Sequence, residues 1–161
     1  MWFLLGCALH SAPPPITPPS AAGEPERSGT TVIDEGTLLT RLGAPQRPTL
    51  FSFWAAWCAP CLAELSTLAL VAARRPDIDV VLVNLDLPGI SPDKALVERG
   101  VTLESWQLAS IDPSAAMARV LPSWDDSIPL TLLVLPDGSV SATFRGQATP
   151  DQILYTLPRN H

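Results

Sequence analysis

The chain has 161 residues, 47% of them hydrophobic, so it is long enough for one domain with a real core and an additional tail. Its net charge is −6 and its basic residues are scattered, which argues against nucleic acid as a partner, because phosphate binding needs a clustered basic face. Three cysteines are too few for a small disulfide-stapled domain, and no run reaches the roughly 18 apolar residues of a membrane-spanning helix.

The first 30 residues have the composition of an apolar head and a tether. Residues 11–29 hold six of the 18 prolines, which favours an extended, semi-rigid spacer. Before it, Leu-Leu-Gly-Cys at 4–7 is similar to the lipobox of bacterial lipoproteins, which makes Cys7 a candidate lipidation site. Only residues 2–6 separate Met1 from Cys7, whereas the apolar region of a signal peptide has about 7–15 residues.

Two interpretations of this head stay open. In the first, the reading frame starts further upstream, and the protein is exported to the periplasm or held on a membrane as a lipoprotein. In the second, the match is a chance one and the protein is cytoplasmic. We expect export, with a lipid anchor at Cys7 as its candidate form.

From residue 31 onward, helical and strand patterns alternate. Residues 34–42 predict a short helix, and the apolar run 48–55 is typical of a strand buried on both faces. A helix is expected over 60–75, because one proline suits its first turn and another follows its end. The apolar run 78–86 predicts a second buried strand.

Two short helices and a third strand are expected next. Ser91 is the predicted N-cap of the first helix, with Pro92 in its first position and Gly100 at its end. Asp112 is the predicted N-cap of the second helix. The apolar run 129–135 then predicts the third strand.

The last part of the chain predicts a hairpin and a final helix. Residues 136–138 form a turn that leads into the partner strand, and the Thr-Pro pair at 149–150 opens a helix through about residue 157. Strands alternating with helices and closed by this hairpin predict an α/β domain over 31–161, with a central mixed β-sheet flanked by helices.

Two cysteines, Cys58 and Cys61, stand where the first buried strand passes into the helix over 60–75. Unpaired backbone N–H groups and the positive end of the helix dipole stabilise a thiolate there. A cysteine at this position in a Cys-X-X-Cys motif has a lowered pKa and becomes nucleophilic near neutral pH. Cys61 lies on the same helical face one turn on, where it can attack a mixed disulfide on Cys58. The pattern favours thiol–disulfide exchange.

Two other interpretations of the cysteine pair are weaker. A structural zinc site needs four ligands, and the remaining candidates, Cys7, His10 and His161, lie in the terminal segments. Inert core cysteines are the second alternative, but the start of a helix is a poor place to bury two thiols. No metal and no cofactor is therefore expected.

Residues 53–61, FWAAWCAPC, resemble the active-site motif of the thioredoxin superfamily. The resemblance continues at Ile128-Pro129, where that family has a cis-proline facing the cysteines, and covers about residues 31–158. The proline-rich tether and the CAPCLAE sequence are most similar to the TlpA/ResA-type exported disulfide reductases. Ser52 stands where cytosolic thioredoxins carry a buried aspartate, which also favours the exported branch. The resemblance implies a thioredoxin-like fold.

Three catalytic residues follow from this resemblance. Cys58 matches the attacking cysteine, Cys61 the resolving cysteine, and Glu64 an acidic residue typical of the TlpA/ResA branch. Glu64 shares a helical face with Cys61, so partial burial would raise its pKa and let it relay a proton for Cys61. The alternative is an ordinary solvated glutamate.

The resemblance also implies four substrate-binding residues. Trp57 matches the tryptophan that packs beside the cysteines, and Pro60 matches the proline between them. Pro129 and its neighbour Ile128 match the cis-proline segment, whose backbone pairs with the substrate chain as an added strand.

The expected function is therefore disulfide exchange with protein substrates, most simply as an exported disulfide reductase that a membrane electron donor such as a DsbD-type protein recharges. Two alternatives stay open. One is a net disulfide oxidase or isomerase, and the other is a redox-sensing module that binds a partner without turnover.

Overall fold

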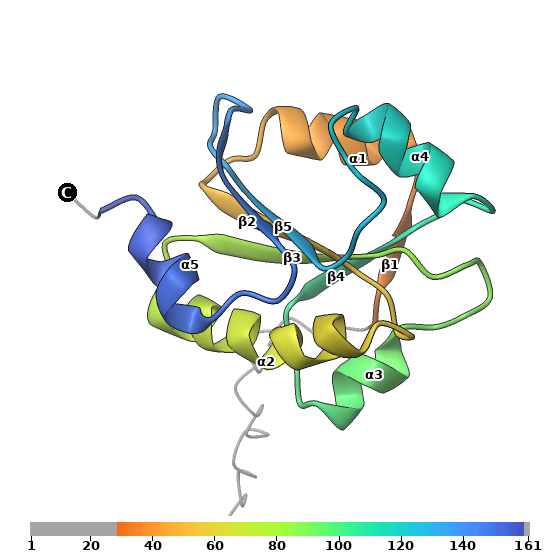
Figure 1. Cartoon of the computed structure of the whole chain (residues 1–161), viewed down its shortest axis with the longest axis horizontal. Helices are drawn as coiled ribbons and strands as arrows, with labels where there is room; N and C mark the ends of the chain where they lie inside the picture. The colour runs from red at the N-terminus through yellow and green to blue at the C-terminus, as the bar shows by residue number, and fades with distance from the viewer. Residues whose placement is uncertain (1–28, 160–161) are drawn as a thin grey trace, which may run out of the picture.

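The two apolar runs predicted as buried strands lie side by side at the centre of a six-stranded sheet. They are β2 (Thr49–Trp54) and β3 (Asp79–Asn84), which pair in parallel. Both are buried because helices cover both faces of the sheet, as Figure 1 shows. These elements belong to a computed structural model that describes residues 29–159, and Cys7, the candidate lipidation site, lies outside the described residues.

The strand order is β1-β4-β3-β2-β5-β6. The first four strands are parallel to one another, whereas β5 pairs antiparallel with β2 and β6 antiparallel with β5. This mixed sheet confirms the predicted fold class. The carboxyl ends of the parallel strands meet at one edge of the sheet, where ligands bind in open α/β sheets. The outer strands are β1 (Thr31–Ile33), β4 (Glu104–Leu108), β5 (Leu130–Val134) and β6 (Val140–Arg145).

The helices of the described segment lie on both faces of the sheet. In Figure 1, α2, α3 and α5 cover one face and α1 and α4 cover the other. In the described residues, none of these helices combines the length and the hydropathy needed to cross a membrane. Their bounds are α1 (Glu35–Gly43), α2 (Ala59–Arg74), α3 (Asp93–Glu98), α4 (Pro113–Val120) and α5 (Pro150–Thr156).

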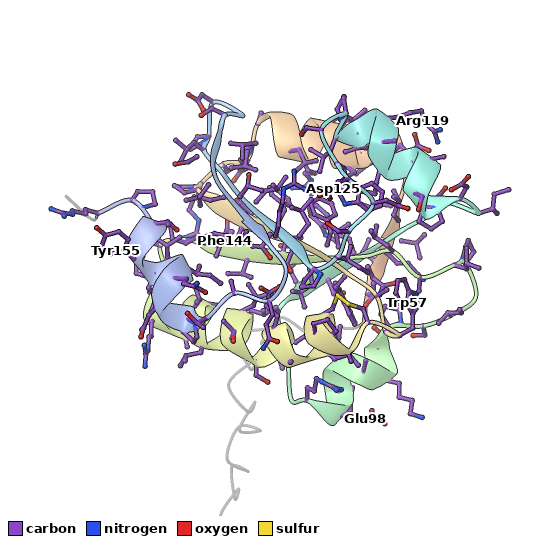
Figure 2. All side chains as sticks on the ribbon, in the orientation of Figure 1. Trp57, Glu98, Arg119, Asp125, Phe144 and Tyr155 are labelled. Carbon is purple, nitrogen blue, oxygen red and sulfur yellow. A yellow bond between two sulfur atoms is a disulfide. The ribbon has the colours of Figure 1, made fainter. Side chains whose placement is uncertain are left out.

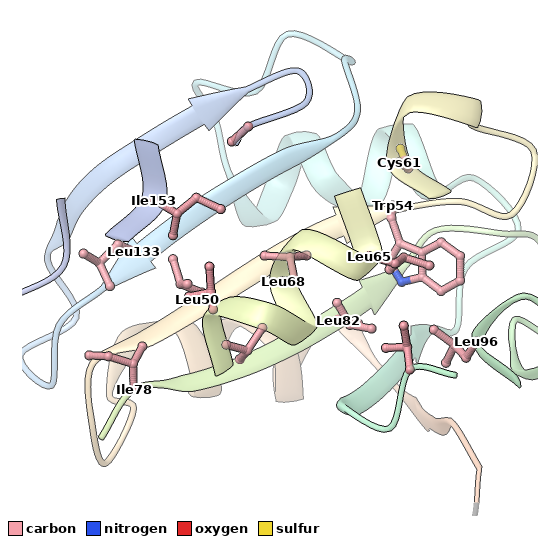
Figure 3. Close-up of a cluster of buried hydrophobic side chains, with 14 of the residues drawn as sticks. Leu50, Trp54, Cys61, Leu65, Leu68, Ile78, Leu82, Leu96, Leu133 and Ile153 are labelled. Atoms are coloured by element: carbon pink, nitrogen blue, oxygen red, sulfur yellow. The ribbon is translucent and has the colours of Figure 1, made fainter. Parts of the chain in front are cut away.

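The sheet divides the apolar interior into two clusters. On one face, Leu50 and Leu82 of the central strands pack with Leu68 of α2. Figure 3 shows this cluster running along α2 as far as Trp54 and Cys61. The core therefore continues directly under the cysteine pair and fixes α2 on the sheet. The cluster on the other face contains Phe51, Phe53, Val83, Leu108, Met117 and Val120.

The predicted cap of α4 is confirmed, and the predicted cap of α3 is wrong. Asp112 caps α4 by accepting a 2.9 Å hydrogen bond from the Ala115 N–H. Pro92, not Ser91, occupies the N-cap position of α3, and the helix begins at Asp93. The Ser91 hydroxyl instead bonds the Asp93 side chain and accepts its N–H, which forms a turn ahead of the helix.

Sequence reasoning missed β1 and β4. β1 has three residues, too few to show a periodicity. In β4, Ser105 and Gln107 alternate with Trp106 and Leu108, yet all four are buried. Ser105 and Gln107 can be buried because they form hydrogen bonds, such as the one from Thr30 Oγ1 to Ser105 Oγ at 3.0 Å. Their partners are distant in the sequence.

Gly138→Ala is expected to destabilise the fold through the β5–β6 hairpin. Gly138 has a φ of +81°, and an added Cβ would lie 2.3 Å from the Gly43 carbonyl oxygen. Strain of this kind costs about 1–3 kcal/mol, and the clash adds to it. Urea unfolding is the measurement. The matched control is Gly43→Ala, whose Cβ meets nothing within 4 Å; a control as unstable as Gly138→Ala would contradict this account.

Candidate functional site

The cysteine pair lies at the carboxyl edge of the parallel strands, between β2 and α2. The chain leaves β2 after Trp54, and Cys58 lies at the start of α2, as predicted, where it is the N-cap residue. The Cys58 N–H donates to the Ala55 carbonyl oxygen at 3.1 Å, which closes the turn between strand and helix. Cys58 and Cys61 form a disulfide, with their Cα atoms 5.2 Å apart.

Cys58 Sγ faces the unpaired end of the helix. The Cys61 N–H donates to Cys58 Sγ at 3.3 Å, in the place where a capping oxygen accepts in other helices. When the disulfide is reduced, this N–H and the helix dipole favour negative charge on Cys58. Cys58 is 5% exposed and Cys61 1%, because the core cluster reaches up to both sulfurs. The prediction from the sequence that the start of a helix is a poor place to bury two thiols is therefore wrong.

The predicted cis-proline faces the disulfide. The Ile128–Pro129 peptide bond is cis, which confirms the expectation. The Ile128 carbonyl oxygen lies 3.8 Å from Cys58 Sγ, although 70 residues separate them in the sequence. Pro129 is buried and Ile128 is half-buried. The cis-proline segment and the disulfide therefore lie next to one another at this end of the sheet.

The other two predicted substrate-binding residues are exposed around the disulfide. Trp57 precedes Cys58 and has 73% of its surface exposed, so it does not pack into the interior. Figure 2 shows it beside the disulfide, at the edge of the molecule. Pro60, between the cysteines, is also exposed. The geometry brings all four predicted residues to one end of the sheet.

Glu64 is buried on the inner face of α2. It is 1% exposed, which excludes the solvated-glutamate alternative. One carboxyl oxygen accepts the Ala148 N–H at 2.8 Å, and the other accepts the Thr131 hydroxyl at 3.4 Å, with Ser52 as a further partner. Burial raises the pKa of Glu64 above its ordinary value, and these hydrogen bonds lower it by less.

A second buried carboxyl, Asp86, supports the loop that carries Cys58. Its Oδ2 accepts the Ala56 N–H and the Asn84 side-chain amide, each at 2.8 Å, and the Asp86 N–H donates to Asn84 Oδ1 at 3.0 Å. In the described part of the chain, its Oδ1 and Trp54 Nε1 are buried without a hydrogen bond. Sequence reasoning assigned Asp86 only to a strand. The signal that could have indicated its role is that two polar residues, Asn84 and Asp86, end an otherwise apolar run.

Possible metal ligands do not gather anywhere in residues 29–159: no three His, Cys, Asp or Glu side chains lie together there. The terminal candidates for a zinc site, Cys7, His10 and His161, lie outside these residues.

Known proteins with related sequences are thioredoxins. No protein-family model matches the chain. It is similar to the mitochondrial thioredoxin O of Oryza sativa subsp. japonica, with 27% identity over 92 residues, which are 50% of this chain and 51% of that protein. The chain spans about half the length of the curated relatives that it matches.

Solved structures of similar fold are disulfide oxidoreductases and their relatives. StoA from Bacillus subtilis is 21% identical, with a TM-score of 0.55 over 68% of this chain and 81% of that one. A secreted disulfide oxidoreductase of Mycobacterium tuberculosis is 19% identical, with a TM-score of 0.53 over 68% and 79%. With this likeness and the Cys58–Cys61 disulfide at the start of α2, the chain is a protein of the thioredoxin-like fold, the fold of thiol–disulfide oxidoreductases.

Proposed function

We propose that the protein is an exported thiol–disulfide oxidoreductase that reduces disulfides in protein substrates through Cys58 and Cys61. The observation that carries this proposal is the disulfide at the N-terminus of α2, with Cys58 Sγ held between the Cys61 N–H at 3.3 Å and the Ile128 carbonyl oxygen at 3.8 Å. The Cys61 N–H and the helix dipole favour a thiolate on Cys58 in the reduced protein, and the Ile128 carbonyl oxygen marks the backbone next to it.

The reaction runs in two exchange steps. The Cys58 thiolate attacks one sulfur of the substrate disulfide, and the other substrate sulfur leaves as a thiolate that takes up a proton. Cys61, after losing its proton, then attacks Cys58 Sγ, and the first substrate sulfur leaves. The substrate gains two electrons and becomes a dithiol, while the protein becomes the disulfide. An external dithiol donor reduces it again, and we propose a membrane protein of the DsbD type for this role.

Trp57, Pro60, Ile128 and Pro129, the four residues around the disulfide, bind the substrate chain in this proposal. The backbone at Ile128 and Pro129 pairs with an extended substrate segment as an added strand, which places the substrate sulfur against Cys58. Trp57 and Pro60 cover the segment on the side of α2. Their exposure supports this role, because a surface aromatic side chain beside a reactive group is available to a partner.

Glu64 moves the proton of Cys61 in this proposal. A buried carboxyl with a raised pKa is suited to take up and release a proton. Glu64 follows Cys61 by one turn on α2, and both side chains are buried. The carboxyl is held by Ala148 and Thr131, so it stays in place beneath the cysteines during exchange.

The proposals that the protein is exported and that it acts as a reductase rest on its similarity to other proteins. One similar solved structure is described as secreted, and residues 53–61 resemble the motif of exported reductases. A lipid at Cys7, which lies outside the described residues, would tether the domain to a membrane through the proline-rich segment. Mass spectrometry of the protein purified from its own cells tests this, since an unmodified Cys7 contradicts lipidation.

Turnover and potential together test the proposed activity. We expect the reduced protein to reduce the interchain disulfides of insulin catalytically with a thiol donor, and its equilibrium with glutathione to give a potential below about −220 mV, in the range of reducing proteins. A value near about −120 mV would make it an oxidase. Absence of turnover would leave the binding module as the explanation.

A chain that begins at Gly29 is expected to fold and to reduce insulin as the full chain does. The basis is that β1 begins at Thr31 and that, within residues 29–159, both apolar clusters are built from residues that follow it. Circular dichroism and the insulin assay compare the two chains, and loss of folding or of more than half of the activity would show that residues 1–28 are structural.

A further inference from the structure

The segment that leads from α4 into β5, residues 121–129, contains neither helix nor strand. It runs from the end of α4 to the start of β5 (Figure 1), and most of residues 122–127 are exposed. It ends at the cis peptide bond between Ile128 and Pro129, where the Ile128 carbonyl oxygen lies 3.8 Å from Cys58 Sγ. Because an exposed segment of this kind has no ladder of backbone hydrogen bonds, its position depends on a few side-chain contacts.

Arg145 of β6 holds this segment ahead of the cis-proline. Its Nη2 donates to the Ser123 carbonyl oxygen at 3.3 Å, and its Nη1 lies 2.8 Å from Asp125 Oδ1. Arg145 is the partner of Leu130 across β5 and β6, so both side chains point to the same face of the sheet, the face that α1 and α4 cover. The planar guanidinium contacts two points of the segment at once, which the single ammonium of a lysine does not match.

Asp125 connects Arg145 to the residue that precedes Ile128. The Ser127 hydroxyl donates to Asp125 Oδ1 at 2.6 Å, and the same oxygen pairs with Arg145. The Ser127 hydrogen bond, followed by the Arg145 charge, holds the pKa of Asp125 below its ordinary value. The carboxylate is therefore ionised near neutral pH, and both contacts are charge-assisted.

The residue after Arg145 holds the other side of the cis-proline. The Gly146 N–H donates to the Pro129 carbonyl oxygen at 2.9 Å, so two consecutive residues of β6 hold the chain before and after the cis peptide bond. The side chains of Arg145 and Asp125 are 44% and 55% exposed, and exposed ion pairs contribute little to global stability. We therefore expect the loss of Arg145 to change the local position of the segment more than the stability of the fold.

We propose that Arg145 is a positioning residue for disulfide exchange with polypeptide substrates, because it keeps the backbone at Ile128 and Pro129 in place beside Cys58. This inference rests on the proposed function. A substrate chain that pairs with this backbone depends on its position, since a misplacement of about 1 Å costs about 10²-fold in rate. A small disulfide has no peptide backbone to pair, so its reduction does not depend on this segment. Arg145 therefore favours polypeptide substrates over small disulfides.

The test compares wild type and Arg145→Met on two substrates, a cyclic peptide closed by a disulfide and bis(2-hydroxyethyl) disulfide. Turnover of both is measured with the same thiol donor. For the peptide, kcat/KM is expected to fall by about three- to tenfold, mainly through KM, the size of effect that a hydrogen bond and an exposed ion pair give. For the small disulfide it is expected to stay unchanged. An equal fall with both substrates, or no fall with the peptide, overturns the proposal.

The pH dependence of Cys58 alkylation tests the competing explanation that the Arg145 charge acts on the thiolate directly. The reduced Arg145→Met protein is expected to show the wild-type profile, because Arg145 acts on the substrate-binding backbone. A profile shifted to higher pH would mean that Arg145 lowers the pKa of Cys58, and it would overturn the positioning role.

A second variant tests the connection through Asp125. Asp125→Asn is expected to lower kcat/KM for the peptide in the same way, by a smaller factor. The double variant Arg145→Met/Asp125→Asn is expected to lose less than the product of the two single effects, because both substitutions remove the same ion pair. A loss equal to that product overturns the proposal.

The matched control is Arg47→Met. Arg47 also pairs with an aspartate in solvent, Asp79, but this is the first residue of β3, at the end of the sheet away from the cysteines. The control is expected to keep the wild-type kcat/KM for both substrates. A fall for the peptide as large as that of Arg145→Met overturns the proposal.

A measurement without turnover separates this inference from the proposed function. The Trp124 indole N–H donates to the Ser127 carbonyl oxygen at 2.9 Å, within the segment, and its NMR signal is assigned by comparison with Trp124→Phe. Its exchange with solvent is expected to be about threefold or more faster in Arg145→Met and unchanged in Arg47→Met. This result supports the positioning role even where wild type reduces neither substrate, which would contradict the proposed function alone. An unchanged exchange rate in Arg145→Met overturns the positioning role.

Discussion

Cys61→Ser is expected to trap protein substrates on Cys58 as mixed disulfides. Cys58 is the N-cap of α2, and its Sγ receives the Cys61 N–H, a backbone group that the substitution leaves in place. Cys58 therefore keeps its reactivity, but the thiol that releases the substrate is gone. Turnover of insulin is expected to fall by about 10³-fold or more, as when one member of a set of residues that act together is removed.

Non-reducing electrophoresis with mass spectrometry measures the trapped species. Cys58→Ser is the control: it retains Cys61, which is 1% exposed and cannot make the first attack, so it is expected to trap little or nothing. Cys58 is itself only 5% exposed in the oxidised protein, so the order of attack depends on its position at the end of the helix more than on a difference in exposure. Equal trapping by both variants, or faster alkylation of Cys61 than of Cys58, would show that the assigned order is wrong.

Glu64→Gln is expected to slow exchange by about 10²–10⁴-fold, the usual contribution of a group that transfers a proton directly. The glutamine fits the same space and accepts the same Ala148 N–H, so the fold is expected to stay intact. It cannot titrate, so the part of the pH–rate profile that belongs to Glu64 is expected to disappear. The matched control is the same substitution at an exposed position, Glu98→Gln, since Glu98 lies on α3 with its side chain in solvent. A wild-type profile in Glu64→Gln would contradict the proton relay.

The same variant gives a stability measurement with a defined sign. Burial raises the pKa of Glu64 above its ordinary value of 4.5, so the folded protein binds this proton more tightly than the unfolded chain. The resulting stability is fully present below about pH 4.5 and is lost as the pH rises through the raised folded pKa. The free energy of unfolding of wild type is therefore expected to fall relative to that of Glu64→Gln over this range. Urea titrations of both proteins at a series of pH values measure it, and a constant difference would contradict the raised pKa.

The cysteine site was largely predictable because its signals are local. A strand pattern, two cysteines three apart and a proline in the first helical turn lie within about a dozen residues, and the capping geometry of Cys58 follows from that order. The cis-proline was predictable only through the resemblance, since nothing within residues 128–129 distinguishes it from a trans proline at the start of a strand.

The sequence by itself determined the helices, the strands β2, β3, β5 and β6 and the place of Cys58, because these depend on apolar periodicity and on capping residues that act over a few positions. The tertiary structure alone decided that Glu64 is buried, because its partners Thr131 and Ala148 are 67 and 84 residues away. It also decided the strand β4, whose polar Gln107 is buried because the turn at 87–90 accepts its amide. Both cases have one physical reason: a polar side chain can be buried only where distant segments supply its hydrogen bonds, and a local pattern does not contain them.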